Sequence, residues 1–116
     1  MKNAQRLADR IKSFGYRVFA VEDRDYGYYS DGTRIAYFDW GFYGFHISSV
    51  NAPGSFGSGY RIADLDSAEA ADKALLEEAL ATVRPTWAER SKKVLKYKNL
   101  DDYLSKYWQK DKLVEL

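Results

Sequence analysis

The sequence predicts a single α+β domain spanning residues 1–116. It consists of an N-terminal helix, an antiparallel meander of four to five strands, and two to three C-terminal helices packing on one sheet face. Three observations lead to this prediction. Apolar residues recur at helical spacing near the N-terminus, aromatic-rich runs separated by turn residues follow, and helical spacing returns from residue 66. The length is that of one domain, and no linker divides it.

The first helix is expected over residues 3–14. Its apolar side chains recur every three or four residues, which places them on one helix face: Ala4, Leu7, Ile11 and Phe14. Gly15 follows as a stop signal. The next run, YRVFAVED, is rich in β-branched and aromatic residues and predicts a strand over 16–23.

A hairpin is expected over residues 26–40, because Asp31-Gly32 supplies the positive φ angles that a tight turn needs. Residues 41–44 predict the next turn, and residues 45–50 the strand that follows it. Alternation on that strand puts Phe45, Ile47 and Ser49 on one face and His46, Ser48 and Val50 on the other. A further strand begins near Tyr60.

From Asp66 the period becomes helical. Asp66 is expected to cap a helix, with Glu69 reaching back to complete the capping box, and Pro85 ends it. The expected buried side is apolar throughout: Ala68, Ala71, Leu75, Leu76, Ala79, Leu80 and Val83. A second capping box opens a helix over 86–97, and Asn99 with Asp102 opens a third.

Composition excludes several classes of function. The chain has no cysteine, which rules out thiolate zinc sites, thiol nucleophiles and disulfides. No apolar run approaches the roughly 20 residues that span a bilayer, and the charged start MKNAQRLADRIKSF lacks the apolar core of a secretory signal. We therefore expect a cytoplasmic protein that does not bind a membrane.

Aromatic residues are concentrated in the predicted sheet: 14 of the 19 lie between Phe14 and Tyr60. Core packing accounts for most of them, but tyrosine and tryptophan are also enriched at interface hot spots. One hypothesis is therefore an exposed patch that binds a protein partner, and the alternative is a set of edge tyrosines that shield the sheet. The candidate partner-binding residues are Tyr28, Tyr37, Trp40, Phe42, Tyr43, Phe56 and Tyr60.

The glycine-rich segment 51–60 does not match a phosphate-binding loop. Such loops lead from a strand into a helix, whereas Gly54, Gly57 and Gly59 precede the strand that contains YRI. The segment also lacks the Gly-Lys-Ser/Thr ending. We interpret it as a turn, with Phe56 either folded on the core or reaching toward a partner.

His46 is the chain's single histidine and the basis of a hydrolase hypothesis. A triad would join it to Ser48 or Ser49 and to a carboxylate such as Asp31 or Asp39, but no motif supports the set. A cross-strand hydrogen-bonded histidine is the simpler interpretation. The acidic pairs lack further ligands at a recognised spacing, so the sequence indicates no metal, no cofactor and no catalytic residues.

Charge is distributed unevenly although the net charge is +1. Residues 61–83 carry two basic against six acidic groups, and residues 84–112 carry nine against four. The simpler interpretation is that these charges lie on two solvent-exposed helix faces that attract each other. The alternative is a nucleic-acid-binding accessory protein that contacts phosphates through the basic C-terminal helices, using Lys92, Lys93, Lys96 and Lys98.

The central run YSDGTRIAYFDW…FHISSVNAPGSFGSGYRI, over residues 29–62, resembles a pattern in small uncharacterised proteins of plasmids and bacteriophages. The shared features are Asp31-Gly32, Ile35-Ala36-Tyr37, Ser49-Val50, Asn51 or Pro53, and Gly57-Ser58-Gly59-Tyr60. The likeness covers about 30% of the chain, which lacks the pattern's basic residue between Val50 and Pro53.

This resemblance implies an origin in a mobile genetic element and a bacterial host. Small proteins of that origin often block host defences by binding a defence complex, such as a CRISPR effector or a restriction enzyme. The expected function is therefore that of a non-enzymatic protein-binding module that inhibits such a complex. A homodimer formed through the aromatic face is left open.

Overall fold

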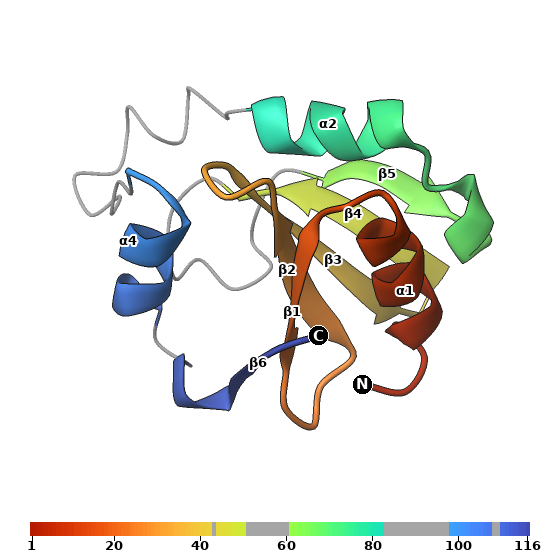
Figure 1. Ribbon diagram of the computed structural model, residues 1–116. Helices are drawn as coiled ribbons and strands as arrows, with labels where there is room; N and C mark the ends of the chain where they lie inside the picture. Colours follow the sequence, from red (N-terminus) through yellow and green to blue (C-terminus); the bar gives the residue numbers. More distant parts are fainter. Residues whose placement is uncertain (43, 51–60, 83–97, 108–109) are drawn as a thin grey trace.

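A computed structural model describes residues 1–42, 44–50, 61–82, 98–107 and 110–116. These residues form a six-stranded antiparallel sheet with the strand order β5-β4-β3-β2-β1-β6, and helices lie on both of its faces (Figure 1). The α+β class and the five-stranded meander are confirmed. The predicted helix over 86–97 and the predicted buried residue Val83 lie outside the described residues.

The elements follow the predicted order, with one addition at the C-terminus. The helices are α1 (Gln5–Ser13), η1 (Ala68–Ala70), α2 (Lys73–Ala81), α4 (Leu100–Lys106) and η2 (Lys110–Lys112). The strands are β1 (Arg17–Val21), β2 (Tyr26–Ser30), β3 (Ile35–Gly41), β4 (Gly44–Ser49), β5 (Arg61–Leu65) and β6 (Leu113–Glu115). No helix among the described residues has both the length and the apolar character needed to cross a membrane.

Strand β6 was not predicted. It pairs antiparallel with β1, with Phe19 opposite Glu115 and Val21 opposite Leu113. An ion pair of 2.6 Å between Arg17 and Glu115 holds this edge. A strand of three residues contains too few positions for a period-2 pattern, so only its pairing with β1 defines it.

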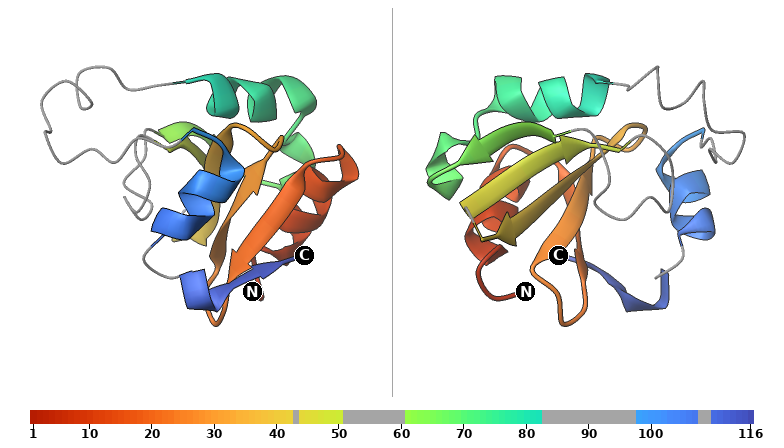
Figure 2. Two further views of the ribbon diagram at one scale, coloured as in Figure 1. Left: turned by 60° about the vertical axis from the view of Figure 1, so that its left-hand side comes forward. Right: turned by 180° about the vertical axis from the view of Figure 1, so that it is seen from behind.

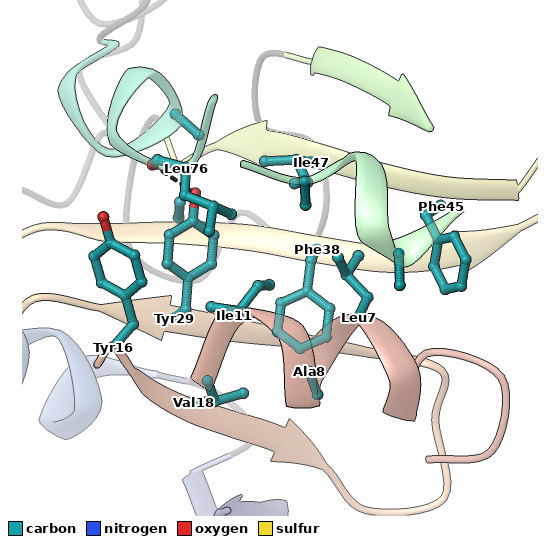
Figure 3. Packing of buried hydrophobic residues seen from close by; sticks show 14 of the residues in the cluster. Leu7, Ala8, Ile11, Tyr16, Val18, Tyr29, Phe38, Phe45, Ile47 and Leu76 are labelled. Atoms are coloured by element: carbon teal, nitrogen blue, oxygen red, sulfur yellow. Dashed lines mark hydrogen bonds between the residues drawn. The ribbon is translucent and has the colours of Figure 1, made fainter. Parts of the chain in front are cut away.

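The helices occupy opposite faces of the sheet (Figures 1 and 2), which corrects the prediction that the C-terminal helices share one face. Helices α1 and α2 cover a core that contains Tyr29, Phe38 and Ile47 (Figure 3). Helix α4 covers the other face with a second set of buried residues: Phe19, Val21, Tyr28, Ile35, Tyr37, Leu100, Tyr103 and Tyr107. Apolar groups on both faces of the strands make this possible, since each face then needs a helix to bury it.

The start of α2 also differs from its prediction. Asp72 caps the helix by accepting a hydrogen bond of 2.8 Å from the backbone N–H of Leu75. Asp66 precedes a short 3₁₀ helix instead, and the extended backbone of Ala71 separates that helix from α2. The predicted Asn99 cap of α4 is confirmed, because its side chain accepts from the N–H of Asp102 at 3.0 Å.

The turn between β2 and β3 occurs where predicted, with a different backbone geometry. Gly32 has a φ of 104°, but Asp31 has no positive φ, in contrast to the prediction for both residues. The Asp31 carboxylate accepts hydrogen bonds from the N–H groups of Thr33 and Arg34, at 2.9 and 2.7 Å. This side chain therefore stabilises a four-residue turn, as aspartate commonly does.

Candidate protein-binding surface at the β3–β4 hairpin

Two large aromatic side chains are exposed on the hairpin formed by β3 and β4. Trp40 is 39% exposed and Phe42 is 95% exposed. Trp40 pairs across the hairpin with Phe45, and Gly41 pairs with Gly44. The Trp40 and Phe45 rings meet edge-to-face with their centroids 4.8 Å apart. Phe45 lies at the end of the buried core (Figure 3), so it fixes the indole to the body of the protein.

A groove of about 340 Å³ lies beside Trp40. Its lining comes from the start of α1, from the hairpin, and from the segment that leads into η1: Lys2, Asn3, Arg6, Trp40, Phe45, Asp66, Ser67 and Glu69. The two rings form its apolar part, and charges of both signs surround them. Arg6 and Glu69 are paired with each other at 2.8 Å.

The carboxylate of Asp25 holds the start of α1 in place, on one side of this groove. Its Oδ1 accepts hydrogen bonds from the backbone N–H groups of Lys2, Asn3 and Ala4, at 2.9, 2.8 and 3.2 Å. Burial opposes ionisation of this carboxyl, but these backbone hydrogen bonds outweigh burial and lower its pKa. No side chain within the helix caps α1, so Asp25 supplies the acceptor that a helix start needs.

The structure separates the seven predicted partner-binding residues into three groups. Trp40 and Phe42 are exposed. Tyr28 and Tyr37, which are 3% and 7% exposed, are packed beneath α4 and are not available to a partner, so that part of the prediction is wrong. Tyr43, Phe56 and Tyr60 lie outside the described residues.

The groove itself was missed by sequence reasoning. Its charged residues come from positions 2–6 and 66–69, which are far from Trp40 in the chain. Nothing in the local pattern indicates that these segments meet. The one available signal was Trp40 itself, a large ring at the end of a predicted strand, where burial is least certain.

His46 is a buried cross-strand residue, 4% exposed, as the simpler interpretation predicted. Its Nδ1 lies 2.6 Å from Oδ1 of Asp64 on the neighbouring strand β5. The hydrolase hypothesis had named Asp31 or Asp39 as the carboxylate partner. Asp31 is used in the β2–β3 turn, and the Oδ2 of Asp39 accepts from the Tyr37 hydroxyl at 3.0 Å.

The serines near His46 do not form an accessible nucleophilic site. Ser48 and Ser49 are 4% and 0% exposed. Ser48 lies on the same strand face as His46, whereas Ser49 lies on the face covered by α1 and α2. The side chain of His46 also contacts Gly41, where a Cβ would lie only 3.0 Å from Nε2. A substrate would have to displace this packing to reach the imidazole.

Asp39 lies directly opposite His46 in the sheet. Its Oδ1 is buried and has no hydrogen-bond partner among the described residues. Burial raises the pKa of this carboxyl, and the hydrogen bond from Tyr37 and the neighbouring His46 and Arg61 offset part of that effect. The ionised form of Asp39 is therefore less stable in the folded protein than in water.

Replacing Asp39 with Asn is expected to raise the free energy of unfolding at pH 7, because burial disfavours the ionised carboxylate and Asn carries no charge. A carboxyl whose pKa is raised by folding binds more protons in the folded state, so its contribution to stability falls as pH rises through the folded pKa. Asn keeps an oxygen for Tyr37 and does not titrate. The gain should therefore grow with pH, which urea unfolding between about pH 4 and 8 would measure. Exposed Asp66→Asn is the matched control, and equal pH profiles for Asp39→Asn and the unmodified chain would contradict the expectation.

Of the four lysines predicted for nucleic-acid binding, the structure describes one. Lys98 is exposed, and its backbone N–H donates to Oδ2 of Asp102 at 2.9 Å. Lys92, Lys93 and Lys96 lie outside the described residues. Within the described part of the chain, no group of three or more His, Asp or Glu side chains is arranged to hold a metal ion.

Comparison of the chain with protein-family models, with curated proteins and with solved structures gives no match. Function must therefore be inferred from the surface chemistry of the chain itself.

Proposed function

We propose that this chain is a non-enzymatic protein-binding module whose contact surface is the β3–β4 hairpin with the groove beside it. The observation that carries the proposal is the exposure of Trp40 and Phe42 at the end of β3, next to a groove of about 340 Å³. Tryptophan is among the residues most enriched at interface hot spots, which lie where aromatic anchors meet pockets. Trp40 is itself anchored by Phe45, so it offers a partner a pre-positioned ring.

The charges around the groove favour a protein partner over a nucleic acid. The basic Lys2 and Arg6 are balanced in number by the acidic Asp66 and Glu69. A nucleic-acid site needs an excess of positive charge along the phosphates. A mixed rim around an apolar centre is instead the usual composition of a protein–protein interface.

The proposed partner is a complex of a bacterial defence system, either a CRISPR effector or a restriction enzyme. The support for this class is the likeness of residues 29–62 to small plasmid and bacteriophage proteins. The chain would inhibit the complex by occupying a surface that the complex needs for its own activity.

The test is to mix the purified chain with candidate defence complexes and to follow co-migration on gel filtration. Phe42→Ser and Trp40→Ser are expected to weaken binding by roughly 2 kcal/mol, or about thirtyfold, as hot-spot truncations do. Val114→Ser is the matched control, because Val114 is an exposed apolar residue (48%) on β6, away from the hairpin.

The outcomes separate the surface from the function. If the chain binds a complex and all three variants bind equally well, the hairpin is not the contact surface. If the chain co-migrates with no CRISPR or restriction complex, the proposed partner class is wrong.

A further inference from the structure

Both edges of the sheet carry features that oppose the addition of another strand. Edge strand β5 has exposed charged residues, Arg61 and Asp64, and its pairing with β4 contains an irregularity between Ile47 and Ser48. Edge strand β6 has three residues, including the charged Glu115. Charged, irregular or very short edge strands are the devices by which proteins avoid edge-to-edge association. Association through the sheet edges is therefore disfavoured, and the hairpin surface is the better candidate.

The groove beside Trp40 is self-complementary in charge. Its basic residues belong to the start of α1, and its acidic residues belong to the segment around η1. Arg6 and Glu69 already pair within one chain, whereas Lys2 and Asp66 form no ion pair with another described residue. A two-fold axis through the groove would place Lys2 of each copy against Asp66 of the other, so the same contact would form twice.

The apolar residues of this surface are also suited to contact with a second copy of the chain. Phe42, which is 95% exposed, belongs to the hairpin that supplies Trp40 to the groove. Phe42 and the rings of the Trp40 groove therefore belong to one surface of the molecule. An isologous dimer needs this arrangement, since each copy must offer both the group that is bound and the site that binds it. Burial of one Phe ring in each groove would remove roughly 150–250 Å² per side chain from water.

From this arrangement we infer that the groove binds a second copy of this chain, with Phe42 of each protomer covering the Trp40 groove of the other. The inference rests on the proposed function in one respect: the dimer would cover the surface assigned to the defence complex. In the dimer the binding surface is covered, so the defence complex binds only the monomer and competes with dimer formation. Binding of the complex would weaken as the chain concentration rises above the dimer dissociation constant.

The first experiment is sedimentation equilibrium of the untagged chain from about 1 µM to about 1 mM, a range that brackets the affinities of small transient interfaces. We expect a reversible monomer–dimer equilibrium within this range. Phe42→Ser should weaken the dimer at least about tenfold, and Val114→Ser should leave it unchanged. Because Phe42 is almost fully exposed, its replacement should preserve the fold, which circular dichroism would verify.

A charge exchange tests the two-fold geometry directly. Lys2→Glu alone and Asp66→Lys alone each create two repulsive pairs in a homodimer, and each should weaken it at least about tenfold at low salt. A mixture of the two single variants should form a heterodimer, because every rim pair then joins opposite charges. The double variant, with both changes in one chain, should dimerise by itself for the same reason. These differences should disappear at high salt, where exposed pairs are screened.

A chain that stays monomeric to about 1 mM overturns the inference. A dimer whose dissociation constant is unchanged by both Phe42→Ser and the charge exchange overturns it as well. Neither result affects the proposed function, which depends on co-migration with a defence complex and on the sensitivity of that binding to Trp40→Ser. Conversely, a dimer with the expected charge pattern that binds no defence complex would support the inference and refute the proposed partner.

Discussion

Gly27→Ala is expected to destabilise the protein by roughly 3 kcal/mol or more. Gly27 lies in β2 between Ala20 of β1 and Phe38 of β3. A Cβ at this position would lie 2.2 Å from the backbone carbonyl oxygen of Phe19 and 3.0 Å from the ring of Phe38. The first contact is with backbone, so relief requires β1 to move relative to β2. The ring of Phe38 is fully buried and has little freedom to retreat.

Thermal unfolding followed by circular dichroism would measure this loss, which corresponds to a fall in Tm of about 10–20 °C for a domain of this size. Gly15→Ala is the comparison. Gly15 has a φ of 92° and no atom within 4 Å of its added Cβ, so only backbone strain of about 1 kcal/mol applies. Equal losses for the two variants would show that the close approach at Gly27 is not a packing constraint.

The sequence predicts those helices and strands in which the repeating pattern of apolar residues is long enough to recognise. Helix α1 and strands β1 to β5 were found because apolar spacing and turn residues repeat over five or more positions. Strand β6 was missed because its existence depends on pairing with β1, a contact across about 95 residues of chain. The cap of α2 was misplaced because Asp66 and Asp72 are both good capping residues. In the structure the extended backbone of Ala71 separates the 3₁₀ helix after Asp66 from α2, which Asp72 caps.

The sequence predicted only part of the candidate surface, again because the rest depends on contacts between distant segments. Tyr28 and Tyr37 face each other across β2 and β3, and sequence reasoning correctly placed them on the sheet. It could not decide whether their face was covered, since α4 lies more than 60 residues further along the chain. Trp40 and Phe42 stay exposed because they lie at the end of the hairpin, where none of the described helices packs over them. Exposure of an aromatic residue is thus a property of the tertiary arrangement, and alternation alone does not determine it.

Tyr103→Ala is expected to cost about 3–5 kcal/mol, as truncation of a buried aromatic residue does. Tyr103 is 1% exposed and anchors α4 on the sheet. Its ring lies 5.7 Å from that of Tyr28 and 5.8 Å from that of Tyr107. The Tyr107 hydroxyl in turn donates to the Tyr28 hydroxyl at 3.2 Å, and burial raises the pKa of both phenols, so this pair stays neutral. Removing the Tyr103 ring leaves a cavity beside a polar contact that cannot easily rearrange.

Urea unfolding would measure the loss, and Tyr103→Phe is the control because it keeps the ring and should cost only about 1 kcal/mol. If the protein remains folded, the Tyr103→Ala variant should still dimerise and still bind the partner, because Tyr103 packs on the sheet face opposite α1, α2 and the Trp40 groove. Loss of binding in a folded Tyr103→Ala protein would instead mean that the surface beneath α4 takes part in recognition. That result would restore Tyr28 and Tyr37 as functional residues, exposed by a movement of α4, and it would place the contact surface on the other side of the sheet.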